Sequence, residues 1–387
     1  MKKMVTRVQV QPARLAWAAD RAGKDEVALT ARFSRYPAWV TGAAEPTFKQ
    51  LEGFANYTHT PLGFLFLLEP PREDVPIPDY RRFGNAGVPR PSADLLETIY
   101  GRQTWQEWYR EYARAEGFER PSWVGSVSVR IPPEQVANAI SNSLGFDMDQ
   151  RAKCPSHDAI RKYLIEAIEA TGGLVMINGV VGMNTHRKLK PEEFRGFALC
   201  DPLAPLVFVN GAGTVGAQVF TLTHELAHLW ADDTALSDAS MTAKGGKEQE
   251  SWANQVAAEA LVPRHELAKA YFGQTSQREF EMLAARFKVS TLVILRRTFD
   301  LGKLTGDDYH AACSTEHQRI LDLMAEQQTG GGGGDFYNTH VVWVGRAFAR
   351  PVISDAAEGR TLFSDAFALL GTRKADTYDE LARVVMA

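Results

Sequence analysis

Two histidines and a glutamate in residues 220–230 (FTLTHELAHLW) have the spacing of a metal-binding helix. His224 and His228 stand at positions i and i+4, so on a helix both imidazoles project from one face and can bind one ion. Glu225 follows the first histidine, where its carboxylate can take a proton from a water molecule that the metal polarises. The pattern therefore predicts a zinc centre at which water attacks a peptide carbonyl.

An alternative interpretation is a pair of hydrogen-bonded histidines in an ordinary core. The neighbouring residues Leu222, Leu226 and Leu229 are apolar, which predicts a buried helix. Burial of two imidazoles and a carboxylate is costly unless a ligand satisfies them. The buried setting therefore favours the metal site.

A third protein ligand is needed, because a catalytic zinc ion takes three and leaves one position for water. In the metzincin pattern a glycine and a third histidine follow the second histidine. Ala231 and Thr234 stand at those positions, which excludes that type of site. The other common solution is a glutamate from a later helix, and residues 247–263 have the pattern of one.

Among the glutamates of that second helix, Glu250 is the favoured ligand. Asn254 lies one turn later on the same face and can support a ligand there. Glu248 stands at the expected helix start, where a carboxylate interacts with the helix dipole, and Glu259 is expected to be solvated. Zinc is the expected ion, although Mn²⁺ or Fe²⁺ can occupy a site with two histidines and one glutamate. The predicted site comprises Glu225 as the general base, the metal ligands His224, His228 and Glu250, and Asn254 as a supporting residue.

The two motifs together resemble the ImmA/IrrE family of metallo-endopeptidases. The second motif consists of Glu250, the pair Ala253-Asn254 and the positions Ala257, Ala258, Leu261 and Pro263. The resemblance covers about residues 140–270 and includes short strands near 194–198 and 207–210. It implies a cytoplasmic, gluzincin-type peptidase with Glu250 as third ligand and a transcriptional repressor as substrate. It also implies a stress-response, mobile-element or toxin–antitoxin setting.

Composition sets the broad class. The chain has 387 residues with 45% hydrophobic and 23% charged residues, which predicts a soluble globular protein of two or three domains. The net charge of −4 gives the whole chain no strong attraction to polyanions. Cys154, Cys200 and Cys313 are scattered, which predicts reduced thiols in the cytoplasm. No signal peptide or membrane span is expected.

The N-terminal segment resembles an XRE-type helix-turn-helix domain through residues 15–17, 39–42, 46–51 and 60–65. Pro37 interrupts the place of the recognition helix, which predicts a shortened reading element. The basic residues that could contact DNA phosphates are Arg14, Arg21, Lys24, Arg32 and Arg35. DNA is therefore a possible partner of this domain, and a solvated helical domain is the simpler alternative.

The predicted fold class is α+β and mainly helical: a zincin-like peptidase core with a small sheet, flanked by helix-turn-helix-like helical domains. Asp232 and Asp233 can orient a histidine or simply end the metal helix in solvent, and the second alternative is favoured. The C-terminal residues are expected to form helices at 341–354, 361–369 and 377–385. The predicted segments are an XRE-like domain (1–68), a proline-rich arm with a helical connector (69–135), the zinc peptidase domain (136–270), a helical subdomain (271–328), a glycine linker (329–335) and a helical appendage (336–387).

Two functions from different classes fit these observations. The first is a zinc-dependent endopeptidase that cleaves a specific regulatory protein, with a helix-turn-helix repressor as the expected substrate. The alternative is an antitoxin-like regulator that binds DNA or a toxin and has weak or no peptidase activity. Glu225 favours the peptidase, because a structural zinc site needs ligands but no base.

Overall fold

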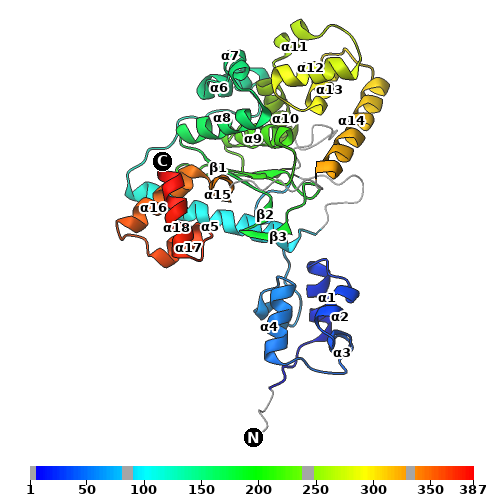
Figure 1. Ribbon diagram of the computed structural model, residues 1–387, viewed down its shortest axis with the longest axis vertical. Helices are drawn as coiled ribbons and strands as arrows, with labels where there is room; N and C mark the ends of the chain where they lie inside the picture. The colour runs from blue at the N-terminus through cyan, green and yellow to red at the C-terminus, as the bar shows by residue number, and fades with distance from the viewer. Residues whose placement is uncertain (1–5, 81–89, 238–247, 328–335) are drawn as a thin grey trace. The chain divides into compact units, whose positions relative to one another are not determined.

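The computed structural model describes residues 6–80, 90–237, 248–327 and 336–387, which form two compact units (Figure 1). The smaller unit takes its described residues from 1–76 and 89–99, and the larger unit from 77–88 and 100–387. The predicted glycine linker at 329–335 lies outside the described residues. The fold class is confirmed: the protein is mainly helical, with a small mixed sheet.

The smaller unit is built from short helices around one apolar core. Leu15, Leu51, Phe54 and Leu65 are almost completely buried in it. The helix at the place of the recognition helix has five residues and includes Pro37. The elements are α1 (Pro12–Arg21), α2 (Glu26–Arg32), α3 (Tyr36–Val40), α4 (Phe48–Tyr57) and the 3₁₀ helix η1 (Leu62–Phe66).

Two of the basic residues expected at DNA phosphates are engaged inside this unit. Arg21 forms a bidentate ion pair with Glu73 (2.5 and 2.6 Å) and donates to the carbonyl of His59. Arg14 is buried and donates to the carbonyl of Leu68 at 2.9 Å. Both guanidinium groups therefore hold the chain after η1 against α1.

The larger unit contains a four-stranded sheet of order β1-β5-β4-β6. Strand β1 (Leu174–Asn178) runs parallel to β5 (Leu206–Asn210). Strand β4 (Gly196–Leu199) is antiparallel to both β5 and β6 (Ala235–Ser237). A separate hairpin pairs β2 (Val180–Val181) with β3 (Asn184–Lys188).

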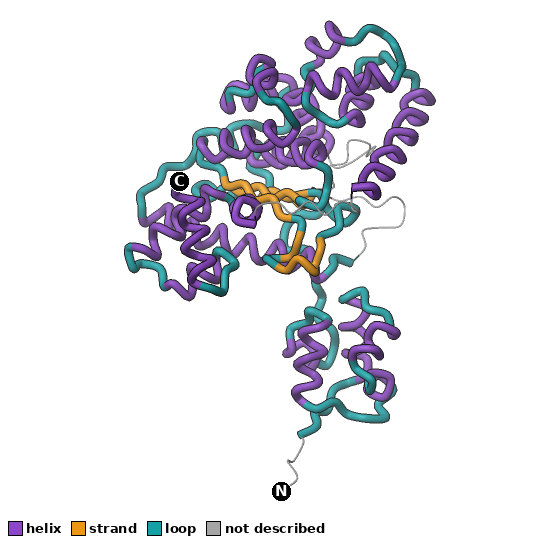
Figure 2. Tube along the Cα trace, in the orientation of Figure 1, coloured by secondary structure: helices purple, strands orange, loops and turns teal. Residues whose placement is uncertain are grey.

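Helices cover both faces of this sheet, which explains why β1 and β5 are buried along their whole length (Figure 2). Helix α9 (Val215–Trp230) packs on β4 and β5, and Val207 and Val209 point into the core on that side. On the other face, the Arg102 guanidinium of α5 (Ala93–Ala115) lies 5.4 Å from the ring of Phe208. The sheet thus supports α9 along much of its length.

The remaining helices surround this sheet–helix core. Helix α10 packs against both α6 and α9, and α13 packs against α12 and α14. These elements are α6 (Pro133–Leu144), α7 (Met148–Lys153), α8 (His157–Ala170), α10 (Glu248–Leu261), α11 (Arg264–Ala270), α12 (Gln277–Phe287), α13 (Thr291–Asp300), α14 (Gly306–Gln327), α15 (Phe336–Val344), α16 (Arg346–Ala357), α17 (Phe363–Leu369) and α18 (Ala375–Met386). None of the described helices is long and apolar enough to cross a bilayer.

The C-terminal end of α10 is held by a buried arginine. Arg151 of α7 donates to the terminal carbonyls of Ala260 and Leu261, which have no acceptor role inside the helix. Its guanidinium lies 4.2 Å from the ring of Phe146, and burial lowers its pKa to about 10. Helix α10 is therefore anchored where its hydrogen-bonding pattern ends.

The prediction of one continuous helix at 341–354 is wrong, because Gly345 separates α15 from α16. This glycine has a φ of +85°, and a Cβ there would lie 2.6 Å from the carbonyl oxygen of Val175. The break lets the two helices pack on β1 in different directions. The helical periodicity of the sequence contains no information about this close contact between Gly345 and β1.

The expectation that Glu259 is solvated is also wrong. It is 6% exposed, and one of its oxygens forms an ion pair with Arg297 of α13. Its other oxygen accepts from the backbone nitrogen of Arg264 at 2.9 Å, while Arg297 also donates to the carbonyl of Val262. A buried, fully hydrogen-bonded pair therefore joins α10 to α11 and α13.

We predict that Glu259→Gln lowers the free energy of unfolding by about 3–5 kcal/mol, because it leaves the buried Arg297 charge without its partner. The matched control is Asp300→Asn, which removes the partly exposed pair with Arg296 and should cost at most about 1 kcal/mol. Urea denaturation of both variants measures the difference. Equal losses would contradict the assigned role of the buried pair.

Candidate metal centre

Helix α9 carries the first motif in a fully buried setting. Thr214 caps its start by accepting from the backbone nitrogen of Ala217. His224, Glu225 and His228 are each at most 1% exposed. The helix is flanked by the sheet, α8 and α10, so its polar side chains have to be satisfied by neighbours rather than by bulk water.

Glu250 of α10 meets both histidines. Its Oε1 lies 3.3 Å from Nε2 of His224, and its Oε2 lies 3.5 Å from Nε2 of His228. The two Nε2 atoms are 3.1 Å apart. The structure thus brings the three predicted ligands together from two helices.

This donor set fits a divalent metal ion. Both carboxylate oxygens of Glu250 are buried and have no hydrogen-bond partner, so the side chain has unused acceptor capacity where the imidazoles converge. Two imidazole nitrogens and a carboxylate are the ligands of many catalytic zinc sites. By mutual distance, His224, Glu225 and His228 also form a possible ligand group, with ligand atoms within 4.8 Å of one another. We favour Glu250 as the third ligand, because its two oxygens each lie close to one imidazole nitrogen, whereas one oxygen of Glu225 is bound by Ser237.

Glu225 is held by the sheet beside the ligands. Ser237 at the end of β6 donates to its Oε2 at 3.3 Å, while its Oε1 has no hydrogen-bond partner. Gly196 of β4 makes room for this carboxylate, since a Cβ there would lie 2.9 Å from Oε1 and 2.6 Å from Thr221. One oxygen is therefore fixed and the other is available.

The two glutamates of this cluster have pKa values that are shifted in opposite directions. Burial raises the pKa of Glu225 well above its ordinary value. Burial also acts to raise the pKa of Glu250, but the two imidazoles close to its oxygens outweigh burial and hold that pKa below its usual range. The carboxylates of Glu225 and Glu250, on the neighbouring helices α9 and α10, thus have pKa values shifted in opposite directions.

The two histidines differ as well. Burial lowers the pKa of His224. Burial has the same effect on His228, but the hydrogen bond with Asp233 and the nearby carboxylate of Glu250 outweigh burial and raise the pKa of His228 to about 10. In the absence of metal, His228 therefore carries the proton that balances Glu250.

Asp233 contradicts the expectation that it ends the helix in solvent. Its Oδ2 lies 3.0 Å from Nδ1 of His228, and its backbone nitrogen donates to the His228 carbonyl at 2.9 Å. Asp232 makes this return possible with a φ of +55°. Tyr80, far earlier in the chain, donates its phenol to Oδ1 of Asp233 at 3.1 Å. Tyr80 and Ser237 could not be predicted as residues of this site, because neither belongs to a local sequence motif.

Asn254 lies beside the first histidine, and its side chain acts to raise the pKa of His224. However, Asn254 Oδ1 and His224 Nδ1 are both buried and make no hydrogen bond of normal geometry. The structure therefore brings Asn254 to the site, and its supporting role stays a prediction.

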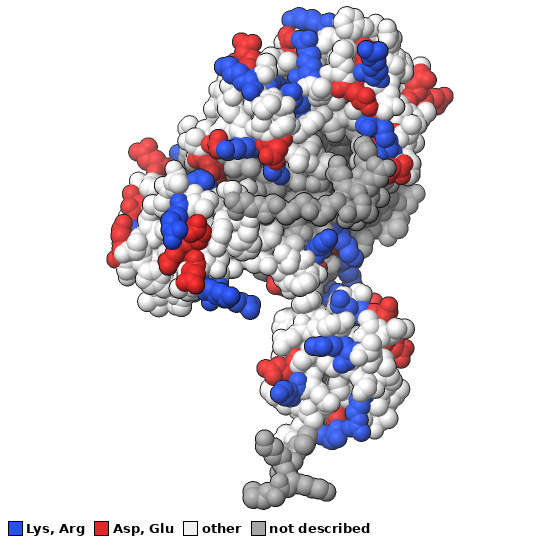
Figure 3. All heavy atoms as spheres, in the orientation of Figure 1, with Lys and Arg blue, Asp and Glu red and all other residues white. Residues whose placement is uncertain are grey.

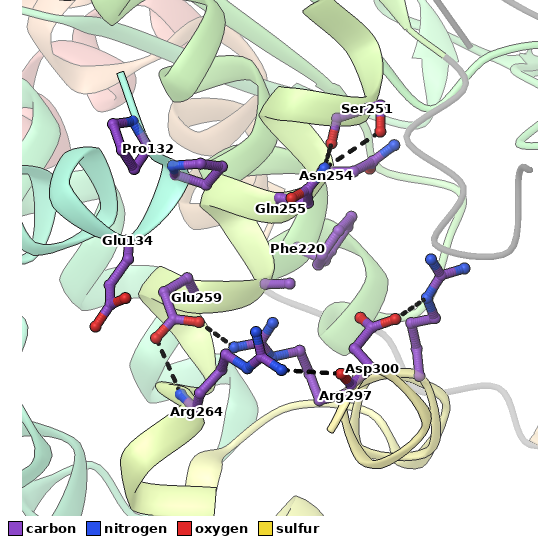
Figure 4. Close-up of a pocket in the computed structure, with 13 residues that line it drawn as sticks. Pro132, Glu134, Phe220, Ser251, Asn254, Gln255, Glu259, Arg264, Arg297 and Asp300 are labelled. Carbon is purple, nitrogen blue, oxygen red and sulfur yellow. Dashed lines mark hydrogen bonds and ion pairs between the residues drawn. The ribbon is translucent and has the colours of Figure 1, made fainter. Parts of the chain in front are cut away.

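A hollow of about 430 Å³ is lined by residues of α6, α9, α10 and α13 (Figure 4), and the four residues of the cluster are not part of its lining. Phe220 lines it, and its ring centroid is 6.4 Å from that of His224. Asn254 and Gln255 line the hollow from α10, and the pairs Glu259–Arg297 and Arg296–Asp300 line its far end. Phe220 therefore places one part of the wall of this hollow near His224.

Comparison with known families identifies two segments of the chain. Residues 169–299 match the IrrE N-terminal-like domain of the M78 peptidases, and residues 344–384 match a domain of unknown function, DUF8813. No curated protein matches the chain significantly. The first match contains both motifs and reaches into α13, past the expected end near residue 270. It supports the ImmA/IrrE family, a zincin-like core and a metallopeptidase-type function for this segment.

We predict that metal binding releases about one proton near neutral pH. His224 has a lowered pKa, whereas His228 stays protonated below a pKa of about 10 and must lose that proton to bind an ion through Nε2. The apparent affinity for Zn²⁺ should therefore rise roughly tenfold per pH unit between about pH 6 and pH 8. Calorimetric titration in buffers of different ionisation enthalpy measures this release. His228→Ala should abolish binding, and a pH-independent affinity in the wild type would contradict the assignment.

Proposed function

We propose that the protein is a zinc-dependent endopeptidase that cleaves a specific regulatory protein. The observation that carries this proposal is the convergence of His224, His228 and Glu250, with Glu225 held separately by Ser237. A structural zinc site needs no additional carboxylate of this kind. The family match at residues 169–299 supports the same class of activity.

In this proposal His224, His228 and Glu250 hold the ion. Bound zinc supplies Lewis acidity, which activates water and polarises the substrate carbonyl. Glu225 accepts a proton from the attacking water at Oε1, while the Ser237 hydroxyl keeps Oε2 in place. Its raised pKa suits this exchange, because a base must also return the proton to the leaving amine.

We infer that the hollow beside His224 receives side chains of the substrate. A peptide whose scissile carbonyl lies at the cluster can extend past Phe220 and Asn254 into this space. The amide of Gln255 and the serine hydroxyl of Ser251 can hydrogen-bond a peptide backbone there. Such contacts restrict cleavage to sequences that fit.

The substrate in this proposal is a helix-turn-helix repressor in the cytoplasm, as the family resemblance implies. The face of the molecule in Figure 3 carries both signs of charge interspersed, so recognition depends on shape and local contacts more than on net charge. If the smaller unit approaches the operator DNA of that repressor, we infer that it uses Arg32 and Arg35, which are exposed. Arg14 and Arg21 are already engaged within the unit, by the carbonyl of Leu68 and the carboxylate of Glu73.

Glu225→Gln should retain zinc and lose about 10²–10⁴-fold in cleavage rate, because the amide keeps the shape of the side chain but accepts no proton. The zinc-loaded wild type and the variant are incubated with a proteome of the source cell, and new N-termini are identified by mass spectrometry. Cuts in a small set of proteins, including a helix-turn-helix protein, are expected with the wild type alone.

The matched control is Ser237→Ala, which removes the hydrogen bond to Glu225 but leaves the base, so it should reduce the rate less than Glu225→Gln. Identical sets of N-termini from the wild type and Glu225→Gln would refute the peptidase assignment. Cuts confined to proteins without DNA-binding domains would refute the substrate class while keeping the activity.

Filling the hollow should separate substrate binding from metal binding. Gln255→Trp places a large ring at the exposed lip of the hollow and should lower cleavage about tenfold or more, with zinc content unchanged. Gln277→Trp on the exposed surface of α12 is the control and should leave cleavage as it is. Wild-type cleavage by Gln255→Trp would exclude the hollow as the substrate site.

A further inference from the structure

The chain just after the smaller unit becomes part of the sheet of the larger unit. Tyr80 donates its backbone nitrogen to the carbonyl of Leu236 at 2.9 Å, and Leu236 donates to the carbonyl of Pro78 at the same distance. Asp79 forms a parallel bridge with Leu236, and Ile77 is 7% exposed. This segment lies in the predicted proline-rich arm. Its backbone is held against β6, the strand that ends in Ser237.

This pairing places the phenol of Tyr80 within reach of the metal centre. The hydroxyl donates to Oδ1 of Asp233 at 3.1 Å, and Oδ2 of the same carboxylate lies 3.0 Å from Nδ1 of His228. The ring of Tyr80 lies 6.1 Å from that of His228, centroid to centroid. A continuous set of hydrogen bonds therefore runs from Tyr80 to the imidazole whose Nε2 faces Glu250.

We propose that Tyr80 is a positioning residue of the metal centre and acts through Asp233 on His228. With one oxygen held by the phenol, the other oxygen of Asp233 is directed at Nδ1 and accepts a hydrogen bond from the Nδ1–H group. In the neutral imidazole that binds an ion, Nε2 is then the nitrogen without a proton, and its lone pair is available to the ion. The inference rests on the proposed metal site.

Tyr80 and the residues that it supports belong to different segments of the chain. The segment that matches the peptidase family spans residues 169–299, and Asp233 and His228 lie within it. Tyr80 lies outside it and reaches Asp233 across 153 positions of sequence. The connector from the N-terminal unit is therefore inferred to complete a metal site that the family domain contains only in part.

The test is Tyr80→Phe in the full chain, which keeps the ring and the backbone pairing but removes the hydroxyl donor. Zn²⁺ affinity is measured by competition with a chromophoric chelator, and the visible spectrum of the Co²⁺-loaded protein reports ligand geometry. We expect about tenfold weaker Zn²⁺ binding and a changed Co²⁺ spectrum, in line with the effect of outer hydrogen bonds on metal ligands. Tyr163→Phe is the control, because its hydroxyl bonds to Leu144 and Gly145, away from the cluster, and it should change neither readout.

A double-mutant cycle with Asp233→Asn shows whether Tyr80 acts through the carboxylate. The double variant should bind Zn²⁺ no more weakly than Asp233→Asn alone, because both changes break the same chain of hydrogen bonds. Additive losses would overturn the proposed route, and wild-type affinity and spectrum in Tyr80→Phe would overturn the proposal itself. Absence of Zn²⁺ binding by the wild type would instead refute the metal site and the proposed function with it.

Discussion

The structure depends on the burial of four ionisable side chains between α9 and α10. His224, Glu225, His228 and Glu250 are each at most 5% exposed, in a region otherwise filled by apolar residues. Groups of this kind are tolerated in a core only when they are paired, hydrogen-bonded or bound to an ion. The surroundings accordingly supply one specific partner after another: Asp233 for His228, Ser237 for Glu225, and both imidazoles for Glu250.

The sheet and the outer helices make this cluster geometrically possible. Strand β4 approaches α9 closely because Gly196 has no side chain, and β6 brings Ser237 to the same place. The position of α10 along α9 has to be fixed for Glu250 to reach both histidines. Arg151 secures its C-terminal carbonyls, and the Glu259–Arg297 pair ties it to α13. Residues far from the chemistry thus determine the spacing within it.

The helical parts of the site were predictable because their determinants are local. The i, i+4 spacing of His224 and His228 places them on one face of any helix, and an apolar surround indicates burial. The choice of Glu250 over Glu248 and Glu259 combined helical position with a family pattern, and the structure brings Glu250 to the histidines. The expectation for Glu259 failed because a carboxylate in a helix can face solvent or a buried arginine, and only the packing of α13 distinguishes the two.

The sequence by itself determined the chemistry available to this protein: two imidazoles, a ligand carboxylate and a base, on two helices of a mainly helical α+β fold. It did so because helical periodicity and residue type act over a few positions. Only the tertiary structure decided how the histidines are oriented, which oxygen of Glu225 is open, and where the hollow lies. Those features rest on pairs such as Tyr80 with Asp233, 153 positions apart, which meet only after the sheet has assembled. Contacts between residues so far apart in the sequence produce no periodic pattern, since each residue alone is compatible with an exposed loop.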